Sequence, residues 1–200
     1  YKDHLVQTGK LNEVGDAILE NVDNSFRRGL EMTVEYRPVP EIEWSGNMTL
    51  SQNKIKNYVE YATDYDDDWN EIQKVTELGT TDISYSPSFV ASHKIMVHPT
   101  KGLSLGIVSK LVGKQYFDNT SSEDRSIDRY SVHDFVSRYL WTMDESSSLD
   151  FQFIINNIFD KNYISNAYGG NWYEQGTEYS WKYFFPQAGI HYTLKVTFTF

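Results

Sequence analysis

The sequence predicts an all-β protein in which antiparallel strands form a transmembrane β-barrel. Three observations predict this class. Apolar and polar residues alternate along most of the chain, short and long connections alternate between the strands, and aromatic residues are frequent although the mean hydropathy is only −0.55. The chain has 15 Tyr, 11 Phe and 5 Trp, which make 16% of its 200 residues. A barrel strand turns every second side chain toward lipid, so it needs apolar residues but no long apolar run.

The alternation is clearest at the end of the chain, where one face of residues 190–200 is apolar. Residues 29–36, 42–51 and 149–155 repeat this pattern. Successive side chains of a strand point to opposite faces, so each segment has one apolar and one polar face. Pro87 interrupts another run, where it would remove a hydrogen-bond donor. The eight expected strands comprise residues 1–8, 24–37, 42–60, 78–98, 103–117, 127–143, 149–160 and 185–200.

The connections between these strands differ in length in a regular way. The short ones are rich in Pro, Gly, Asp and Ser, and the long ones are polar. They alternate, the short ones at 38–41, 99–102 and 144–148 and the long ones near 9–23, 61–77, 118–126 and 161–182. Short turns therefore lie at one end of the sheet and long loops at the other. Outer-membrane barrels have this arrangement, whereas a sandwich with Greek-key links is not expected to sort its loops so regularly.

Aromatic residues collect at the ends of the expected strands. Tyr36 and Trp44 flank the first short turn, and Tyr58, Tyr61 and Tyr116 lie at the opposite ends. Amphipathic rings are favoured at the two interfaces of a membrane. Aromatic residues are also common in strands of any kind, but their concentration at strand ends favours two aromatic girdles.

Composition and charge exclude several classes of protein. The 18 basic and 28 acidic residues give a net charge of −10, which argues against a broad nucleic-acid surface. The chain has no cysteine, which excludes disulfides, thiolate zinc sites and cysteine nucleophiles. Its five histidines are scattered without metal-ligand spacing, and no G-x-S-x-G elbow is present. We therefore expect neither an enzyme nor a bound metal or cofactor.

Several segments resemble one family of outer-membrane proteins. Residues 183–200 resemble the final strand of TonB-dependent receptors, and residues 155–163, INNIFDKNY, resemble their NNLFDKxY strand-to-loop signature. Residues 10–15, 21–31 and 112–125 are also similar to this family. The resemblance covers essentially the whole chain, and its last two hairpins are the most specific part.

The resemblance implies that residues 1–200 are the C-terminal segment of a larger barrel. They would be the last eight strands of a 22-stranded barrel in the outer membrane, with long loops extracellular and the N-terminal plug domain absent. The implied function is TonB-driven uptake of a scarce ligand, with a ferric siderophore or similar metal chelate as the first candidate. Implied partners are the plug, the TonB complex through the plug, the ligand, outer-membrane lipid and the barrel-assembly machinery, for which the terminal Phe200 would be the signal. The polar strand faces, with Glu31, Glu35, Glu43 and Lys195 among them, would line the interior and bind the plug.

Two loop regions contain candidate ligand-binding residues. Residues 60–77 carry seven acidic residues and one lysine, a net charge of −6. The carboxylates Asp66, Asp67 and Asp68 would suit a hard cation, although acidic runs are more often solvated surfaces. Trp69, Trp172 and Tyr173 are large rings in polar surroundings, which either contact a ligand or cover the barrel mouth.

Two alternatives to a receptor segment remain open from the sequence. One is a small, closed eight-stranded outer-membrane barrel, either an adhesin or a barrel enzyme. The other is a soluble β-sandwich that binds glycans through exposed Trp and Tyr. A sandwich would bury Leu194, Val196, Phe151 and Trp44 in one dry interior, whereas a barrel would turn them outward.

Overall fold

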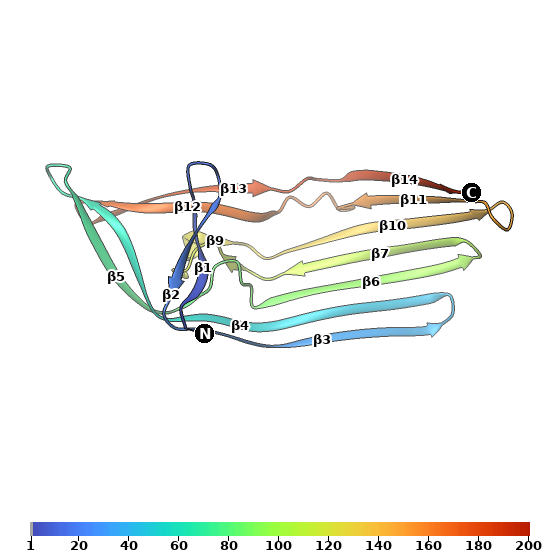
Figure 1. The fold of residues 1–200 in the computed structure, drawn as a ribbon, viewed down its shortest axis with the longest axis horizontal. Helices are drawn as coiled ribbons and strands as arrows, with labels where there is room; N and C mark the ends of the chain where they lie inside the picture. The colour runs from blue at the N-terminus through green and yellow to red at the C-terminus, as the bar shows by residue number, and fades with distance from the viewer. Residues whose placement is uncertain (1) are drawn as a thin grey trace.

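The computed structural model describes residues 2–200, so Tyr1 of the first expected strand lies outside the described residues. Over these residues the chain is almost entirely strand, and one short 3-10 helix, η1 (Glu123–Arg125), interrupts it (Figure 1). None of the helical structure described in residues 2–200 is long and apolar enough to cross a membrane. The strands are β1 (His4–Leu11), β2 (Ala17–Val22), β3 (Ser25–Val39), β4 (Ile42–Tyr65), β5 (Glu71–Asp82), β6 (Phe89–Thr100), β7 (Leu103–Val112), β8 (Gln115–Tyr116), β9 (Ser126–Ile127), β10 (Tyr130–Thr142), β11 (Ser148–Asn156), β12 (Ile164–Glu174), β13 (Thr177–Pro186) and β14 (His191–Thr199).

One open antiparallel sheet, here called the wall, forms the larger part of the molecule. Its strands follow the order β3, β4, β6, β7, β10, β11 and β14, with β3 and β14 at the edges. Tight turns connect the strands at one end, and all longer connections leave from the other, the loop end (Figure 1). The expected alternation of short and long connections is therefore present.

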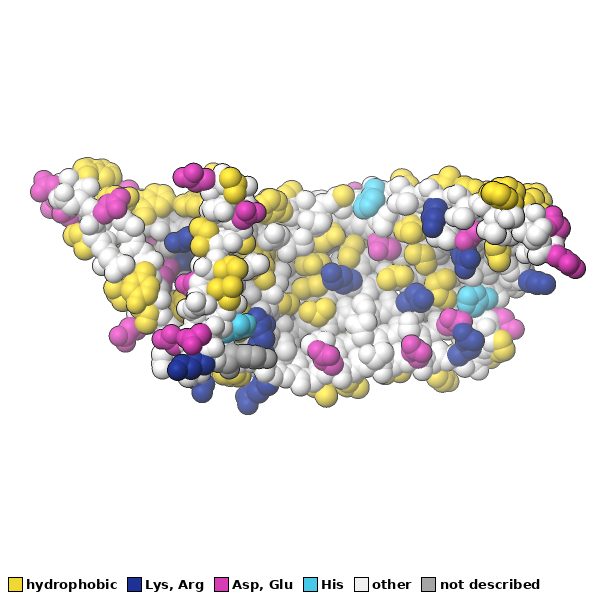
Figure 2. Space-filling model, viewed as in Figure 1, with side chains coloured by type: hydrophobic (Ala, Val, Ile, Leu, Met, Phe, Trp, Pro, Cys, Tyr) yellow, Lys and Arg dark blue, Asp and Glu magenta, His cyan; other side chains and the backbone are white. Residues whose placement is uncertain are grey.

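The two faces of the wall differ in chemistry because the register aligns like residues across the strands. One row of neighbouring residues is apolar in every strand and consists of Tyr36, Trp44, Ile95, Ile107, Phe135, Ile155 and Tyr192. The next row points to the other face and contains Glu35, Ser45, Lys94, Val108 and Asp134. The hollow face in Figure 2 shows acidic, basic and histidine side chains.

The apolar side of the wall is exposed and does not form a shared interior. Leu194 is 69% exposed, Val196 52% and Trp44 37%, and Phe151 is half-buried. A sandwich would pack these residues against a second sheet. The wall instead has the amphipathic pattern of a sheet with lipid on one side and a polar lumen on the other.

The first expected strand, residues 1–8, is not part of the wall. β1 pairs with β2 in a separate two-stranded sheet. Asn12 closes this hairpin, because its side-chain oxygen accepts hydrogen bonds from the amides of Val14 and Asp16. The expected strand is therefore present as β1, but its place in the wall was wrong because it pairs within this hairpin.

The expected strand at 78–98 is divided, and the expected loop at 61–77 is part of a hairpin. β4 continues to Tyr65 and pairs with β5 beyond the point where it leaves β6. The interruption is at residues 83–88, around Pro87, where Ser51 donates to the carbonyl of Ser88 and Ile83 donates to the carbonyl of Asn53. As expected, Pro87 lies outside the strands. β5 ends before it at Asp82, and β6 begins after it at Phe89.

The expected loop at 161–182 is also largely a hairpin. β12 and β13 pair along most of their length through a two-residue turn at Gln175 and Gly176. Both turn residues have positive φ, 51° and 79°, as the favoured hairpin turns require. Sequence reasoning assigned residues 161–182 to a polar loop, although Tyr179, Trp181 and Tyr183 alternate with polar residues in β13.

Most of the fully buried side chains lie at the loop end, in a compact region here called the cap. The cap consists of β1, β2, the distal part of β4 with β5, residues 83–88 and 113–129, and the β12–β13 hairpin. One core cluster contains Val6, Val22, Ile55 and Ile83, and a second contains Phe117, Ile127 and Ala167. Each cluster thus joins segments that are far apart in sequence.

Candidate functional site

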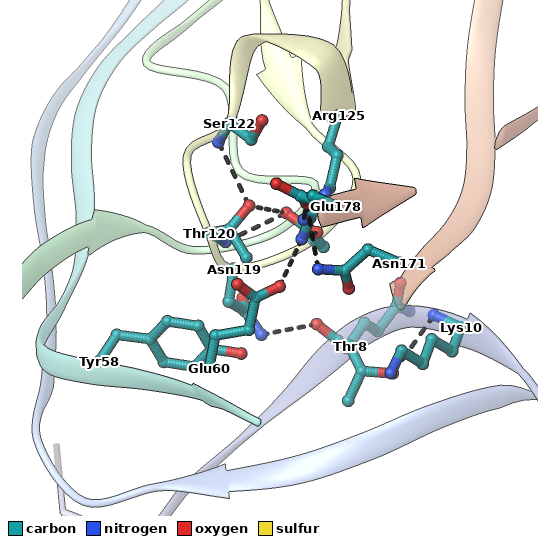
Figure 3. A network of polar contacts seen from close by, with 12 residues as sticks. Thr8, Lys10, Tyr58, Glu60, Asn119, Thr120, Ser122, Arg125, Asn171 and Glu178 are labelled. Atoms are coloured by element: carbon teal, nitrogen blue, oxygen red, sulfur yellow. Dashed lines mark hydrogen bonds and ion pairs between the residues drawn. The ribbon is translucent and has the colours of Figure 1, made fainter. Parts of the chain in front are cut away.

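The candidate site is a group of buried polar side chains at the centre of the cap (Figure 3). Arg125, at the end of η1, contacts carboxylates from three other parts of the chain. Its Nη1 lies 2.6 Å from Oε1 of Glu60 and 2.9 Å from Oδ2 of Asp118, and its Nη2 lies 2.6 Å from Oε1 of Glu178. These bonds connect β4, the segment before η1, and β13.

Burial makes this arrangement energetically demanding. The Arg125 side chain is 8% exposed, and those of Asp118 and Glu60 are 10% and 12% exposed. Burial alone lowers the pKa of Arg125, but the adjacent Asp118 and Glu60 carboxylates outweigh it and raise the pKa above its ordinary value. Arg125 therefore stays charged, and three carboxylates surround a single guanidinium.

A second buried group, centred on Asn119, links the β1–β2 hairpin to the rest of the cap. Asn119 is fully buried, and its Nδ2 donates to the carbonyl of Gln7 at 2.9 Å and to Oε1 of Glu20 at 2.8 Å. Its Oδ1 accepts from the amide of Ser84 at 2.9 Å. Tyr58 also donates to Glu20, at 2.9 Å. Burial, and next the charge of Glu20, raise the pKa of Tyr58, so its hydroxyl remains a donor.

Two cavities lie next to these groups. One, of ≈ 310 Å³, lies between the β1–β2 hairpin and Arg125, and Glu20, Glu60 and Lys10 are part of its lining. The other, of ≈ 650 Å³, lies between residues 126–130 and β13. Its lining includes three cations, Arg129, Lys161 and Lys182, and three rings, Tyr130, Tyr163 and Phe184. Two carboxylates, Glu123 and Asp128, also line it. The rings of Tyr130 and Tyr163 lie 4.7 Å apart. Both volumes are in the range of small-molecule sites.

The acidic candidates lie at the tip of the β4–β5 hairpin, away from both cavities. Asp66 caps the turn, because its Oδ1 accepts from the amides of Asp68 and Asn70. The Asn70 side chain also donates to Asp66, and together these bonds lower the pKa of the Asp66 carboxyl. Within residues 2–200 no three acidic or histidine side chains are arranged to hold a metal ion. The structure thus gives Asp66 a local structural role, and Asp67 and Asp68 lie beside it in the same turn.

The aromatic candidates occupy different positions. Trp69 is at the same hairpin tip, 71% exposed, with its ring 6.0 Å from that of Tyr65. Trp172 stacks on Tyr179 at 5.7 Å and donates to Glu174. Tyr173 points the other way, into the cap. It is 9% exposed, and its ring lies 3.6 Å below the ammonium group of Lys74.

Sequence reasoning did not identify the residues at the centre of the cap. Arg125 and Asn119 lie in a polar segment without periodicity, and Arg125 is 65 residues from Glu60 and 53 from Glu178. The cavity of ≈ 650 Å³ was missed for the same reason. Phe200, the proposed assembly signal, follows β14 at the turn end, 91% exposed and stacked on Phe198 at 5.5 Å.

Comparisons with solved structures agree with this architecture. The siderophore receptor PiuA from Acinetobacter baumannii matches 98% of this chain with a TM-score of 0.66 and 18% identity. The ferric-catecholate import receptor Fiu from E. coli matches 100% with a TM-score of 0.59 and 18% identity. The copper transporter OprC matches 100% with a TM-score of 0.60 and 16% identity. Searches with protein-family models and among curated proteins gave no match.

These likenesses establish the fold. The chain resembles the barrels of TonB-dependent outer-membrane receptors, as residues 155–163 and 183–200 had suggested, and the three structures named above are receptors or transporters. The chain spans about a quarter of the length of these structures, 24% of PiuA, 24% of Fiu and 27% of OprC.

Proposed function

We propose that this chain is the C-terminal barrel segment of a TonB-dependent receptor that imports a scarce ligand, with a ferric siderophore or similar metal chelate as the first candidate. The observation that carries the proposal is the amphipathic open wall with all long connections gathered in one cap. An open sheet edge is costly in lipid, so β3 and β14 would pair with further strands of a 22-stranded barrel.

Several partners follow from this proposal. The polar face of the wall would hold an N-terminal plug domain through residues such as Glu35, Lys94 and Arg138, and the plug would contact the TonB complex. The apolar face would contact outer-membrane lipid, and the cap would be extracellular. Phe200 would be recognised by the barrel-assembly machinery.

The cavity of ≈ 650 Å³ is the best candidate for a ligand subsite in this segment. Many metal chelates carry negative charge on planar groups, and Arg129, Lys161 and Lys182 together with Tyr130 and Tyr163 offer cations and rings in one place. The names of PiuA and Fiu support an iron chelate as the cargo. The name of OprC supports another metal, copper, as the alternative cargo.

The proposal is tested with the full polypeptide that contains this chain. Binding of ferric chelates is measured by quenching of tryptophan fluorescence, with a copper chelate as the second ligand. Uptake is measured in cells with and without TonB. We expect uptake that requires TonB, and we expect the double variant Lys161→Ala/Arg129→Ala to bind the cargo at least tenfold more weakly. Uptake that is independent of TonB, or no binding of any metal chelate, would contradict the proposal.

A further inference from the structure

A continuous aromatic surface covers the outer face of the β12–β13 hairpin. We call it the aromatic ladder, and it consists of Tyr168, Trp172, Tyr179, Trp181, Tyr183 and Phe185. The register places these residues on one face, with Tyr168 opposite Tyr183 and Trp172 opposite Tyr179. Trp181 lies opposite Gly170, and a Cβ on that glycine would be 3.2–3.4 Å from the indole, so the ring lies close over the bare backbone.

Four of the rings, those of Tyr168, Trp181, Tyr183 and Phe185, contact one another, and Trp172 and Tyr179 form a separate stacked pair. Tyr168 lies 5.3 Å from Tyr183 and 5.6 Å from Phe185, and Trp181 lies 5.6 Å from Tyr183. The ladder is nevertheless open to its surroundings, because Tyr179, Trp181, Tyr183 and Phe185 are 43%, 39%, 59% and 44% exposed. An exposed aromatic patch of this extent is typical of a binding surface.

The opposite face of the hairpin shows which way the ladder points. Ala167 and Tyr173 on that face are 1% and 9% exposed, and Glu178 binds Arg125. Lys182 donates to the carbonyl of Asp124. This face therefore packs onto the interior of the cap, and the ladder points away from the axis of the wall, on the lipid-facing side.

Two features distinguish the ladder from an extension of the lipid-facing band. Its face contains no Leu, Ile, Val or Met, whereas the outward rows of the wall contain Ile95, Ile107, Leu194 and Val196. It is also too long for a membrane interface. From Tyr179 to Phe185 the strand extends about 20 Å, or about 15 Å in height at a typical tilt. The polar layer on each side of a bilayer is only about 5–8 Å thick.

We propose that the aromatic ladder binds the sugar rings of glycolipids in the membrane leaflet next to the cap. The ladder is continuous with the lipid-facing side of the wall and rises from it to the height at which such sugars stand. Flat apolar rings with polar edges suit a pyranose, which has an apolar face and hydroxyl groups around its edge. The inference concerns the flank of the barrel and does not depend on the transported cargo.

The experiment uses the full polypeptide in phosphatidylcholine nanodiscs that contain either a glycolipid with several hexoses or the same lipid without its sugars. Bound glycolipid is counted by native mass spectrometry. We expect Trp181→Leu, which keeps an apolar side chain but removes the ring, to weaken glycolipid binding about tenfold, as expected for one stacked ring. Trp181→Tyr should restore most of it. Trp69→Leu, at an exposed tryptophan outside the ladder, is the matched control and should change binding less than twofold.

The other possible occupants give distinct results, each of which would overturn the proposal. Equal binding of the sugar-free lipid, or unchanged binding by Trp181→Leu, would make the ladder a simple lipid contact. A dimer that Trp181→Leu dissociates would make it an interface between two copies. Protection of Trp181 from chemical oxidation without any glycolipid would show that another loop of the polypeptide covers it. Unchanged heat-modifiability of the barrel on electrophoresis verifies that the variants are folded.

Discussion

The wall and the cap are stabilised in different ways, although β4 runs through both. The wall has almost no buried core, and hydrogen-bonded ladders hold it between an exposed apolar face and a polar face. The cap has a conventional interior, with Phe117, Ile55 and Ile83 buried to 1–2% exposure. The difference shows that one chain can combine a sheet with an exposed apolar face and a region with a packed interior.

The ion pairs of the two regions also differ in how far they are exposed to solvent. In the wall, Arg138 and Asp150 form a bridge of 2.9 Å in which the arginine is 53% exposed. In the cap, Arg125 is 8% exposed and bound by three carboxylates. An exposed pair contributes little to stability, whereas removing one partner of a buried group leaves uncompensated charge. The cap should therefore be the region that a single charge substitution disrupts.

The largest effect is expected from Arg125→Met. It leaves Glu60 and Asp118 buried without their cation, so the free energy that keeps the cap closed should fall by about 3–5 kcal/mol. Hydrogen exchange of residues 113–129 in the full polypeptide measures this opening. The wall should keep its protection, because Arg125 contacts β4 only at Glu60, in the distal part that belongs to the cap.

The matched control for this prediction is Arg138→Met. We expect it to reduce stability by less than about 1 kcal/mol, since the Arg138 side chain is mostly exposed. Equal effects of the two substitutions would mean that the cap and the wall do not differ in how they hold charge.

The second prediction concerns the lipid-facing side of the wall. Leu194→Arg places a charge on that side and should destabilise the barrel in lipid by about 2–4 kcal/mol if the residue lies near the bilayer centre. Thr193→Arg, one residue earlier, points to the polar face and should cost much less. Refolding into vesicles at a series of urea concentrations measures both, and the reverse order would contradict the assignment of the two faces.

The wall was predictable from sequence because its two faces meet different surroundings along every strand. The alternation in residues 190–200, 29–36 and 42–51 reports this directly, and the corresponding β14, β3 and β4 lie in the wall. The cap was not predictable in this way. β1 was expected as a wall strand, yet a turn closed by Asn12 pairs it with β2.

The candidate site was still less accessible to sequence reasoning. A buried arginine and a surface arginine look alike in a polar segment, and only the fold brings Glu60, Asp118 and Glu178 to Arg125. The sequence did indicate that aromatic rings are abundant in 161–182. It could not show that Tyr173 points into the cap while Trp172 points out, because that division depends on which face of the β12–β13 hairpin packs on residues 113–129.

A third, smaller effect should come from the junction of the two long hairpins. β12 pairs with the distal part of β4 at Tyr173 and Glu174, and Lys74 lies over the Tyr173 ring at 3.6 Å. Lys74→Met keeps the aliphatic stem but removes the charge, and we expect a loss of about 1 kcal/mol from the cation–π contact. Lys56→Met, whose ammonium lies 5.8 Å from the Phe26 ring, should cost less. Chemical denaturation, monitored through a label on the β4–β5 hairpin, compares the stability of the two variants.

The smallest effect is expected at the tip of the β4–β5 hairpin, where the turn depends on Asp66. Hydrogen bonds from the side chain and amide of Asn70 lower the pKa of the Asp66 carboxyl. A lowered pKa in the folded turn means that the stabilisation is complete above the ordinary pKa of an aspartate and is lost as the pH falls through the lowered value. The turn should therefore stay ordered down to moderately acidic pH and loosen only below the usual range of aspartate. Fluorine NMR of labelled Trp69 reports this order, and Asp66→Ala should show the loosened signal already at neutral pH. Asp67→Ala removes the same charge from the next residue but leaves the bonds of Asp66 in place. If it loosened Trp69 equally, general charge repulsion and not the capping bonds would control the turn.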